Sequence, residues 1–344
     1  MKVWEIAKGV MGLQALRQAE RPDPVARAGQ VVVRMHAASL NYRDQAVLNG
    51  GYPGGTPTGD VIPLSDGAGE VIAVGEGVSR LKVGDRVVAG FNQVDPKGPP
   101  SGPRLPLGAP LDGVLTEKMA FYEDGVVKLP DALSYEEGSC MPCAGVTAWH
   151  ALMAAGKPIK PGDSVLVMGS GGVSLWALEI AKAAGCRVIA TTSRADKAAK
   201  LKAMGASDVI NYRDNPDWDK AAIELTGGKG VDVIVEVGGS GTLGRSINAV
   251  GAGGKITLIG VLTHYENGKP AKVENPSPHG LMFKGASLHG VFVGDRSMLE
   301  GLTRAVEVNR LKPVIDKVFG FDDVLGAFRH AQSGDFMGKI VVRI

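Results

Sequence analysis

The segment from residue 164 to residue 194 constrains the fold of this chain more than any other part of the sequence. It reads SVLVMGSGGVSLWALEIAKAAGCRVIATTSR. Ser164–Ser170 is an apolar strand candidate, Val173–Ala184 has the apolar face of a helix, and Cys186–Ser193 is a second strand candidate. A glycine-rich turn joins the first strand to the helix. This order predicts a strand–helix–strand unit of a parallel sheet.

The glycine-rich turn has the features of a dinucleotide-binding loop. Gly169, Gly171 and Gly172 allow a tight turn and a close approach of the backbone to a pyrophosphate at the helix N-terminus, where Val173 follows. Ser174 replaces the third glycine of G-x-G-x-x-G, a position that serves helix–strand packing and tolerates a small residue. We therefore predict dinucleotide binding; the alternative is a purely structural glycine turn.

The end of the second strand indicates which dinucleotide binds. An NAD site places an acid there for the ribose 2′-hydroxyl, but this strand ends in Thr-Thr-Ser193-Arg194, with Lys197 following. Asp196 comes later and is expected to cap the next helix. Hydroxyls and cations suit a 2′-phosphate, so we predict NADP(H). The alternative is a solvated helix start with ordinary charges.

Strands and helices alternate through the rest of the middle of the chain. Further apolar strands are expected at Asp208–Tyr212, Val231–Gly239, Gly253–Gly260 and Ala286–Gly294. Strands that are apolar throughout belong to a parallel sheet covered on both faces. The sequence therefore predicts an α/β, doubly wound domain.

The two ends of the chain have a different character. The first third is β-rich, with Val-rich runs at Val31–Leu40, Gly69–Gly75 and Asp85–Phe91, and then a long Pro- and Gly-rich loop at Gln93–Asp112. The tail from Ser297 holds an amphipathic helix and a last strand and is too short for a core of its own. We expect it to return to the first domain, which makes the parallel-sheet domain an insertion.

Charge and cysteine content exclude several classes of function. The formal net charge of +2 offers no basic face for nucleic acid or for an anionic membrane. No apolar run approaches the roughly 20 residues of a membrane span, and no signal peptide is recognisable. Three cysteines are too few for a disulfide framework. These features predict a cytoplasmic protein whose partners are neither nucleic acid nor a membrane.

Several ordered motifs carry a family resemblance. The sequence resembles the medium-chain dehydrogenase/reductase superfamily over nearly its whole length, most of all its zinc-free quinone oxidoreductase and alcohol-dehydrogenase-like branch. The matching elements are Ala38–Asp44, Asp66–Val71, Val83–Val87, Ala144–Trp149, Gly169–Gly172 and Gly338-Lys339. The resemblance implies a GroES-like β-barrel catalytic domain from residues 1–125 and 295–344, and a Rossmann domain from residues 126–294. It also implies a homodimer that pairs Rossmann sheets at the edge near Leu288–Gly294.

The resemblance bears on the question of a metal. Zinc-using members take ligands from a Cys, a His and a further Cys or Asp, and the matching positions here are Asn41, Ser65 and Cys143. Catalytic zinc needs three protein ligands and an open position. One thiol, an amide and a hydroxyl do not supply them, so we predict no metal. Asp66 is expected to fix its loop, with a proton-relay role left open.

The expected activity is NADPH-dependent, metal-independent reduction of quinones or α,β-unsaturated carbonyls. Without a Lewis acid, hydride adds best to a carbon whose negative charge can delocalise. The catalytic candidates are Asn41, Tyr52 and Ser65. The residues predicted to bind the cofactor are Thr147, Gly169, Gly171, Gly172, Val173, Ser193, Arg194, Lys197, Tyr212, Gly238, Val261, Val291, Val293 and Lys339. The resemblance implies that Thr147 touches the nicotinamide, that Val261 and Val291–Val293 hold its carboxamide, and that Lys339 closes on the phosphates.

Other readings stay open at this point. Asn41 could brace its loop, Tyr52 could serve packing and Tyr212 could lie in the core. An alcohol dehydrogenase or ketone reductase of the same fold is the second functional hypothesis. A non-catalytic protein that binds NADPH is the third.

Overall fold

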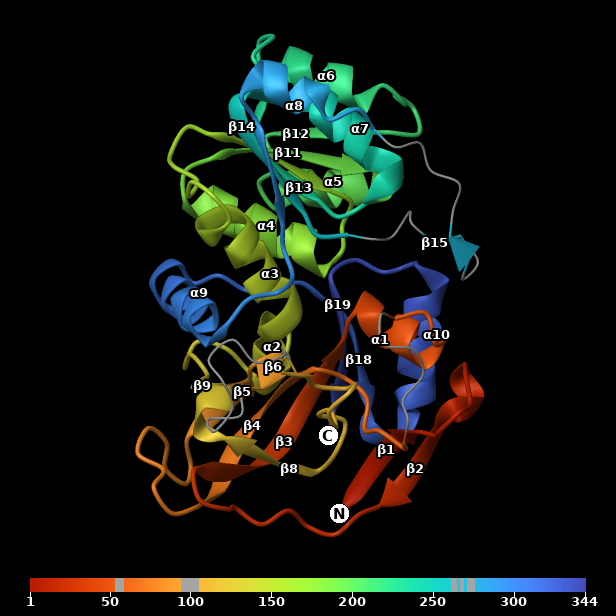
Figure 1. Cartoon of the computed structure of the whole chain (residues 1–344), viewed down its shortest axis with the longest axis vertical. Coiled ribbons are helices and arrows are strands. Elements are labelled where there is room, and N and C mark those ends of the chain that lie inside the picture. The colour runs from red at the N-terminus through yellow and green to blue at the C-terminus, as the bar shows by residue number, and fades with distance from the viewer. Residues whose placement is uncertain (53–58, 94–104, 261–264, 267–268, 271–275) are drawn as a thin grey trace. The chain divides into compact units, whose positions relative to one another are not determined.

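The structure is a computed structural model that describes residues 1–52, 59–93, 105–260 and 276–344, and the backbone of residues 265–266 and 269–270. The chain forms two compact units. The first unit contains residues 1–146 and 293–344, and the second contains residues 147–292. The tail belongs to the first unit, and the second unit is one continuous segment inserted into it (Figure 1).

The second unit is built on a six-stranded sheet in which every neighbouring pair is parallel. The strand order is β12-β11-β10-β13-β14-β17. The strands are β10 (Ser164–Met168), β11 (Arg187–Thr192), β12 (Asp208–Asn211), β13 (Val231–Glu236), β14 (Val250–Leu258) and β17 (Ser287–Gly290). The order reverses between β10 and β13, and ligands of such sheets bind beyond the carboxyl ends of the strands at that point. The predicted α/β, doubly wound fold is confirmed.

Helices connect these strands. Four of them are longer than one turn and join successive strands: α4 (Gly172–Ala183), α5 (Ala195–Ala203), α6 (Trp218–Leu225) and α7 (Ser240–Ala249). The shorter elements are α3 (Val146–Trp149), a π-helical turn (His150–Ala154), α8 (His279–Lys284) and the hairpin of β15 (Tyr265–Glu266) with β16 (Lys269–Pro270). The sheet residues that these helices cover, such as Leu166 and Ile234, are fully buried, as a sheet packed on both faces requires.

The first unit contains a largely antiparallel sheet that joins both ends of the chain. Its strand order is β18-β19-β3-β4-β5-β9, and β8 also pairs with β3. The strands are β3 (Gln30–Leu40), β4 (Asp66–Val74), β5 (Arg86–Ala89), β8 (Lys118–Tyr122), β9 (Val126–Lys128), β18 (Ile315–Gly320) and β19 (Lys339–Arg343). Only β18 and β19 pair in parallel. Thus β19, near the end of the sequence, lies directly beside β3 (Figure 1).

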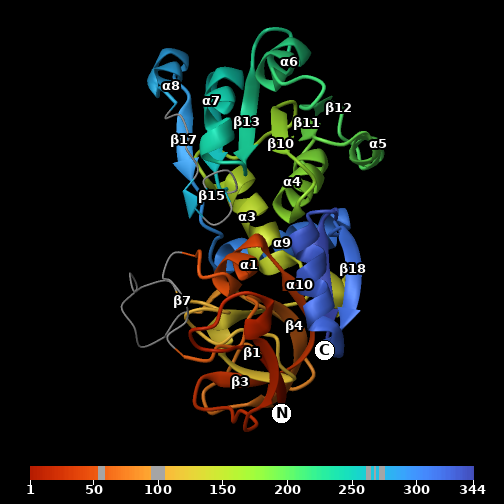
Figure 2. The same ribbon diagram turned by 90° about the vertical axis from the view of Figure 1, so that its right-hand side faces the viewer.

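Smaller elements complete the first unit. α10 (Val324–Ser333) packs alongside β18 and β19 (Figure 2), and α9 (Arg296–Asn309) packs against β9. The others are β1 (Lys2–Ile6), β2 (Leu16–Glu20), α1 (Tyr42–Leu48), β6 (Asn92–Gln93), β7 (Leu105–Pro106), α2 (Tyr135–Gly138), a π-helical turn (Met141–Gly145) and 3₁₀ turns at Leu13–Ala15, Glu123–Gly125 and Phe321–Asp323. Residues 126–146 lie in this unit and not in the second one, because β9 pairs with β5 and α2 packs on β3 and β4.

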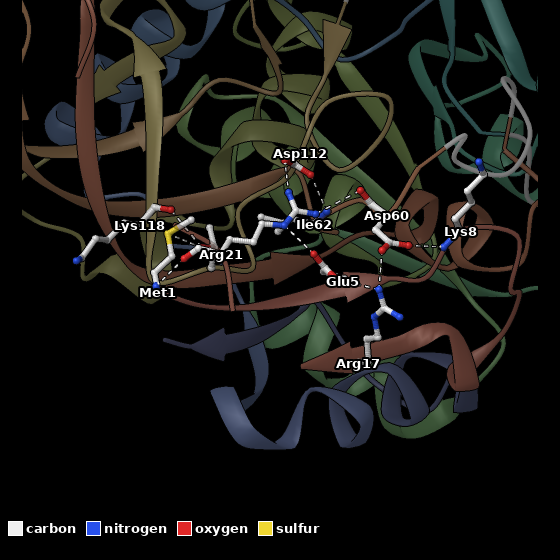
Figure 3. A network of polar contacts seen from close by, with 10 residues as sticks. Met1, Glu5, Lys8, Arg17, Arg21, Asp60, Ile62, Asp112 and Lys118 are labelled. Atoms are coloured by element: carbon white, nitrogen blue, oxygen red, sulfur yellow. Dashed lines mark hydrogen bonds and ion pairs between the residues drawn. The ribbon is translucent and has the colours of Figure 1, made fainter. Parts of the chain in front are cut away.

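A network of charged side chains fastens the β1–β2 hairpin to the rest of the first unit (Figure 3). The Arg21 guanidinium donates to Glu5 at 2.7 Å and to Asp112 at 2.6 Å. Arg17 bridges Glu5 and Asp60, and the Asp60 carboxylate also accepts from the backbone N–H of Lys8. Glu5 is only 6% exposed, so its two arginine partners offset the cost of burying its charge.

Lys255 is a buried cation within the second unit. It lies on β14, is 6% exposed, and donates from Nζ to the carbonyls of Leu152 at 3.2 Å and Ala155 at 2.7 Å. These carbonyls belong to the π-helical turn 150–154 and the residue after it. Burial lowers the pKa of Lys255 from its ordinary 10.5 to about 8.

This pKa predicts a pH-dependent contribution to stability. Below pH 8 the lysine is charged in both the folded and the unfolded chain, so the full cost of burying the charge is present. Between about pH 8 and 10.5 the unfolded chain holds the extra proton, so stability rises with pH. We expect wild type to gain about 2 kcal/mol relative to Lys255→Met between pH 7 and pH 10 in urea unfolding. Parallel pH profiles for the two proteins would contradict this, and Lys157→Met, at an exposed lysine, is the control.

Candidate functional site

The glycine turn lies at the carboxyl end of β10, where the strand order reverses. Gly169 has a φ of +71°, a conformation that favours glycine, and its N–H donates to the carbonyl of Thr191 at 2.9 Å. Ser174 is buried on α4 and donates from Oγ to the carbonyl of Met168 at 2.6 Å. The serine in the third motif position is thus hydrogen-bonded within the helix–strand contact and leaves the turn intact.

Gly171 shows that this turn fits a cofactor. It precedes the first residue of α4 with φ −77° and ψ 171°, which any residue can adopt, and a Cβ added there meets no atom within 4 Å. Neither backbone strain nor packing among the described residues therefore requires glycine. A ligand that approaches the backbone of a helix N-terminus does require it. Gly172 and Val173, the first two residues of α4, offer the N–H groups of that first turn.

The predicted 2′-phosphate residues gather beyond β11 and β12. The N–H of Tyr212 donates to the carbonyl of Thr192 at 2.9 Å, which places Tyr212 beside Ser193. Tyr212 is 42% exposed, so it is not a core residue. Ser193 and Lys197 are half-buried. These positions are compatible with a shared phosphate site but do not by themselves establish one.

Arg194 carries a local ion pair in this region. Its guanidinium makes two contacts of 2.9 Å to the carboxylate of Asp196. Arg194 itself is the residue that precedes α5, and Asp196 lies within the first turn, so the expected capping role of Asp196 is not what the structure shows. The hydrogen bond from Arg194 lowers the pKa of Asp196.

Glu236 is a residue of this site that the sequence analysis missed. It ends β13 and is fully buried. Its carboxylate accepts from the N–H groups of Gly238 at 2.8 Å and Gly239 at 2.9 Å, from Thr242 Oγ1 at 2.6 Å, and from the hydroxyl of Ser246. It thereby fixes the loop that carries Gly238. An acid directly after the apolar stretch Val233–Val235 was the available signal.

The remaining predicted cofactor residues are distributed over both units. Thr147 is buried at the start of the second unit, and the N–H of Val291 donates to the carbonyl of Leu258 at 2.9 Å. Val293 belongs to the first unit and has a φ of +48°, unusual for a β-branched residue. Val261 lies outside the described residues.

In the first unit, three neighbouring strands of the sheet bring Asn41, Asp66 and Lys339 together at the end that these strands share. Asn41 follows β3, Lys339 begins β19 and Asp66 begins β4. Leu40 faces Ile340 and Ser39 faces Asp66 in the antiparallel register. Lys339 is 3% exposed and Asp66 is fully buried.

The amide of Asn41 is held on one side only. Its Oδ1 accepts a hydrogen bond from Lys339 Nζ. Its Nδ2 is buried and has no hydrogen-bond partner among the described residues. An unpaired buried donor costs about 1–3 kcal/mol, so it needs an explanation. A substrate oxygen would be a suitable acceptor.

Ser65 and Asp66 lie behind this amide. Ser65 Oγ donates to Asp66 Oδ1 at 2.6 Å, and Asp66 Oδ2 accepts from the backbone N–H of Cys143 at 3.0 Å. Asp66 therefore fixes its loop, as expected. Ser65 is fully buried with its proton directed at Asp66, so the structure does not support the direct catalytic role predicted for it.

The donor set does not fit a zinc ion. Lys339 Nζ lies against Asn41 Oδ1, the atom that would have to replace the first zinc ligand, and would repel a divalent cation there. Among the described residues no group of three or more His, Cys, Asp or Glu side chains is arranged to hold a metal ion. Burial raises the pKa of Cys140 to about 12 and also raises that of Cys143, so neither is a ready thiolate.

Arg43 links the candidate Tyr52 to the rest of this unit. Its guanidinium lies 4.9 Å from the centre of the Tyr52 ring and 5.1 Å from that of Phe91. It also donates to the carbonyl oxygens of Leu107 at 2.8 Å and Ala109 at 3.1 Å. Tyr52 is thus packed by its ring face against a cation, and both the packing role and a role for its hydroxyl remain compatible with its half-buried position.

Asp44 serves the backbone of Asn41. Its carboxylate accepts from the N–H of Asn41 at 2.7 Å and pairs with Arg43 at 3.3 Å. Burial raises the pKa of Asp44 to about 6. The side chain therefore braces the start of α1.

The contacts of Lys339 that the structure describes lie within the first unit. Its ammonium donates to the carbonyl of Leu40 at 2.7 Å and to Asn41 Oδ1, and lies 3.8 Å from Asp66 Oδ2. The Lys339 ammonium is therefore engaged in two hydrogen bonds and one ion pair within the first unit. The role of Lys339 in closing on the cofactor phosphates, which the resemblance implies, stays a prediction.

Comparisons with known proteins identify the family of this chain. A family model described as an alcohol dehydrogenase GroES-like domain matches residues 27–131, and one described as a zinc-binding dehydrogenase matches residues 172–307. A zinc-type alcohol dehydrogenase-like protein of Schizosaccharomyces pombe is 36% identical over 345 aligned positions, and the match covers 97% of each chain.

No helix within the described residues is long and apolar enough to cross a membrane.

Two further relatives represent different activities. A quinone oxidoreductase of Homo sapiens is 28% identical, and the match covers 93% of this chain and 90% of that protein. A crystal structure of an NAD-dependent alcohol dehydrogenase is 31% identical, with a TM-score of 0.88 and full coverage of both chains. These relatives have the two kinds of activity that the sequence analysis weighed against each other.

Proposed function

The chain belongs to the medium-chain dehydrogenase/reductase superfamily of nicotinamide-dependent oxidoreductases, and we propose that it is an NADPH-dependent, metal-independent reductase of quinones or α,β-unsaturated carbonyls. The observation that carries this proposal is the amide of Asn41. Its Nδ2 is buried without an acceptor, beside a lysine in place of a metal. A neutral donor of this kind polarises an oxygen weakly compared with Zn²⁺, which favours substrates that are already activated.

The residues of the first unit account for binding and charge stabilisation. A bound nicotinamide cofactor supplies the hydride. Asn41 Nδ2 donates to the substrate oxygen and stabilises the negative charge that develops on it as the β-carbon, or the quinone ring, is reduced. The resulting anion takes up a proton, and the hydroxyl of Tyr52 is the candidate donor.

The second unit accounts for cofactor binding. Gly169, Gly171 and Gly172 would hold the pyrophosphate, and Glu236 keeps the loop of Gly238 in place. Thr147, Val291 and Val293 are proposed to contact the nicotinamide end. We assign the 2′-phosphate of NADPH to Ser193, Arg194, Lys197 and Tyr212, because no acid ends β11.

The reaction is tested by a steady-state screen of the purified protein. Naphthoquinones and short enones should be reduced with NADPH, and the rates should not change after dialysis against a chelator. Simple ketones should react at least about ten times more slowly, because they do not delocalise the charge. Loss of activity on chelation would reject the metal-independent mechanism.

A second function has specific support. Two of the relatives above are named as alcohol dehydrogenases or alcohol dehydrogenase-like proteins. Oxidation of secondary alcohols with NADP⁺ at rates above those of enone reduction would favour that activity. A failure of hydride transfer with every acceptor and alcohol would leave the third possibility, a non-catalytic NADPH-binding protein.

Arg194 provides a test of the cofactor. In wild type we expect tighter binding of NADPH than of NADH. Arg194→Ala should weaken NADPH binding by roughly 10–100-fold, the value of a charge-assisted hydrogen bond, and leave NADH unchanged. Fluorescence titration of both cofactors measures this. Arg187→Ala is the matched control, since Arg187 pairs with Asp208 at the amino ends of β11 and β12.

We also propose a homodimer formed through the β17 edge. Exposed apolar side chains gather on β17 and on the segments before and after it; they are Met282, Phe283, Leu288 and Phe292. An apolar sheet edge of this kind is suited to pairing with a second copy. Light scattering should give twice the chain mass, and Phe283→Glu should reduce it.

A further inference from the structure

Among the described residues that Lys339 contacts, Asn41 has a buried side-chain atom without a hydrogen-bond partner. Its ammonium touches the carbonyl of Leu40, the carboxylate of Asp66 and the amide oxygen of Asn41. Leu40 ends β3 and Asp66 begins β4, and the Asp66 carboxylate also accepts from Ser65 Oγ and from the backbone N–H of Cys143. The atom of Asn41 without a partner among the described residues is Nδ2.

The lysine decides which end of the amide is left open. An asparagine side chain can turn its amide by a half rotation, which exchanges Oδ1 and Nδ2 with little change of shape. If the Asn41 amide were turned in this way, its N–H₂ donor would face the ammonium donor. The Lys339 contact would be lost and the oxygen, an acceptor, would occupy the open position. An acceptor there would repel a substrate oxygen.

The charge of Lys339 also changes the strength of the amide donor. A cation bound to the carbonyl oxygen draws electron density from the amide and makes its N–H groups better donors, as hydrogen bonds in a chain polarise one another. Asp66 keeps the cation in place, at 3.8 Å, in a site that is almost free of solvent. Ser65 and the N–H of Cys143 hold the Asp66 carboxylate in turn.

We propose that Lys339 is a positioning residue that fixes and polarises the amide of Asn41 so that its N–H group meets the substrate oxygen, and that it does not bind the cofactor. The inference rests on the proposed function of the site. In this proposal the contacts Ser65–Asp66, Asp66–Lys339 and Lys339–Asn41 together hold one hydrogen-bond donor, Asn41 Nδ2, in place. No covalent step is involved.

A double-mutant cycle on the full chain tests this. Wild type, Lys339→Met, Asn41→Ala and the double variant are compared for kcat and KM with NADPH and a naphthoquinone, and for NADPH affinity by fluorescence titration. We expect Lys339→Met to lower kcat by roughly 100-fold, the effect of removing one oriented donor, with no change in NADPH affinity. In the Asn41→Ala background, Lys339→Met should change kcat less than about twofold, because the residue it acts through is already absent.

Two outcomes would overturn the proposal. Additive losses of kcat would mean that Lys339 acts independently of Asn41. A loss of NADPH affinity in Lys339→Met would return the residue to the cofactor phosphates. Lys312→Met, at an exposed lysine of the same unit, is the control and should match wild type in every measurement.

Folding is controlled for separately, because Lys339→Met leaves Asp66 buried without its cation. The variant Lys339→Met/Asp66→Asn removes both charges and should fold with the same low kcat. The side-chain amide ¹⁵N resonances of Asn41 give a readout without turnover: they should shift in both variants, and unchanged resonances would contradict the proposal. If wild type turned over no quinone or enone, the proposed function would fail while this spectroscopic result still judged the role of Lys339.

Discussion

Asn41→Ala is expected to lower kcat for quinone reduction by about 10²–10³-fold while NADPH affinity stays at the wild-type value. The physical reason is that Asn41 Nδ2 is a buried donor with no partner in the part of the chain that the structure describes. In the alanine variant the Asn41 amide no longer donates a hydrogen bond to the substrate oxygen, so the negative charge that develops there is less stabilised. Stopped-flow measurement of NADPH oxidation separates this step from cofactor binding and product release.

Asn41→Asp sharpens this prediction, because aspartate has nearly the same volume and only acceptor atoms at neutral pH. It keeps the contact with Lys339 and should nevertheless lose as much activity as the alanine variant. Asn309→Ala removes an exposed amide on α9 and serves as the control. If Asn41→Asp were as active as wild type, Asn41 would be a brace for its loop, the alternative that the sequence left open.

Gly171→Asp is expected to weaken cofactor binding by about 100-fold or more, which corresponds to about 2.7 kcal/mol, without lowering the melting temperature. The backbone at Gly171 is extended, and its Cβ position is empty for 4 Å around, so the fold accepts a side chain. A carboxylate there would occupy the place of the pyrophosphate and repel its charge. Calorimetric titration with NADPH and thermal unfolding measure the two quantities.

Gly320 offers a matched control for this substitution. It also precedes a helical turn with extended backbone, φ −79° and ψ 162°, and its Cβ position is equally free, but it lies at the end of β18 in the first unit. Gly320→Asp should change neither stability nor NADPH binding. Equal NADPH affinity of Gly171→Asp and wild type would show that the cofactor does not approach this turn.

The parallel sheet could be predicted from sequence because its signals are local. The run from Ser164 to Arg194 contains a whole strand–helix–strand unit, and the middle of each of its two strands is apolar. Strand β3, predicted at Val31–Leu40, is observed at Gln30–Leu40 for the same reason. By contrast, α1 (Tyr42–Leu48) is short, and the sequence analysis gave no helix there. Its start depends on Asp44 accepting the N–H of Asn41.

The role of Lys339 could not be predicted, because it depends on pairing between distant parts of the chain. Nothing near Gly338-Lys339 indicates that the lysine lies opposite Asn41, almost 300 residues earlier; the register of β19 on β3 places it there. The contact that holds Asp66, the hydrogen-bond partner of Ser65, is also distant in sequence, because Asp66 accepts from the backbone N–H of Cys143. The limit of the second unit at Thr147 likewise follows from the pairing of β9 with β5 and not from composition.

The pairing of β19 with β3 also sets the order in which a newly synthesised chain can become active. Residues 37–40 leave the ribosome early, but the strand that covers their edge is made only after the whole of the second unit. The second unit is one continuous segment and can fold during synthesis, whereas the first must wait with an open strand edge, a state that is prone to aggregation. The ammonium of Lys339 arrives with that final strand. The contact that orients the Asn41 amide and the last strand of this sheet are therefore completed together.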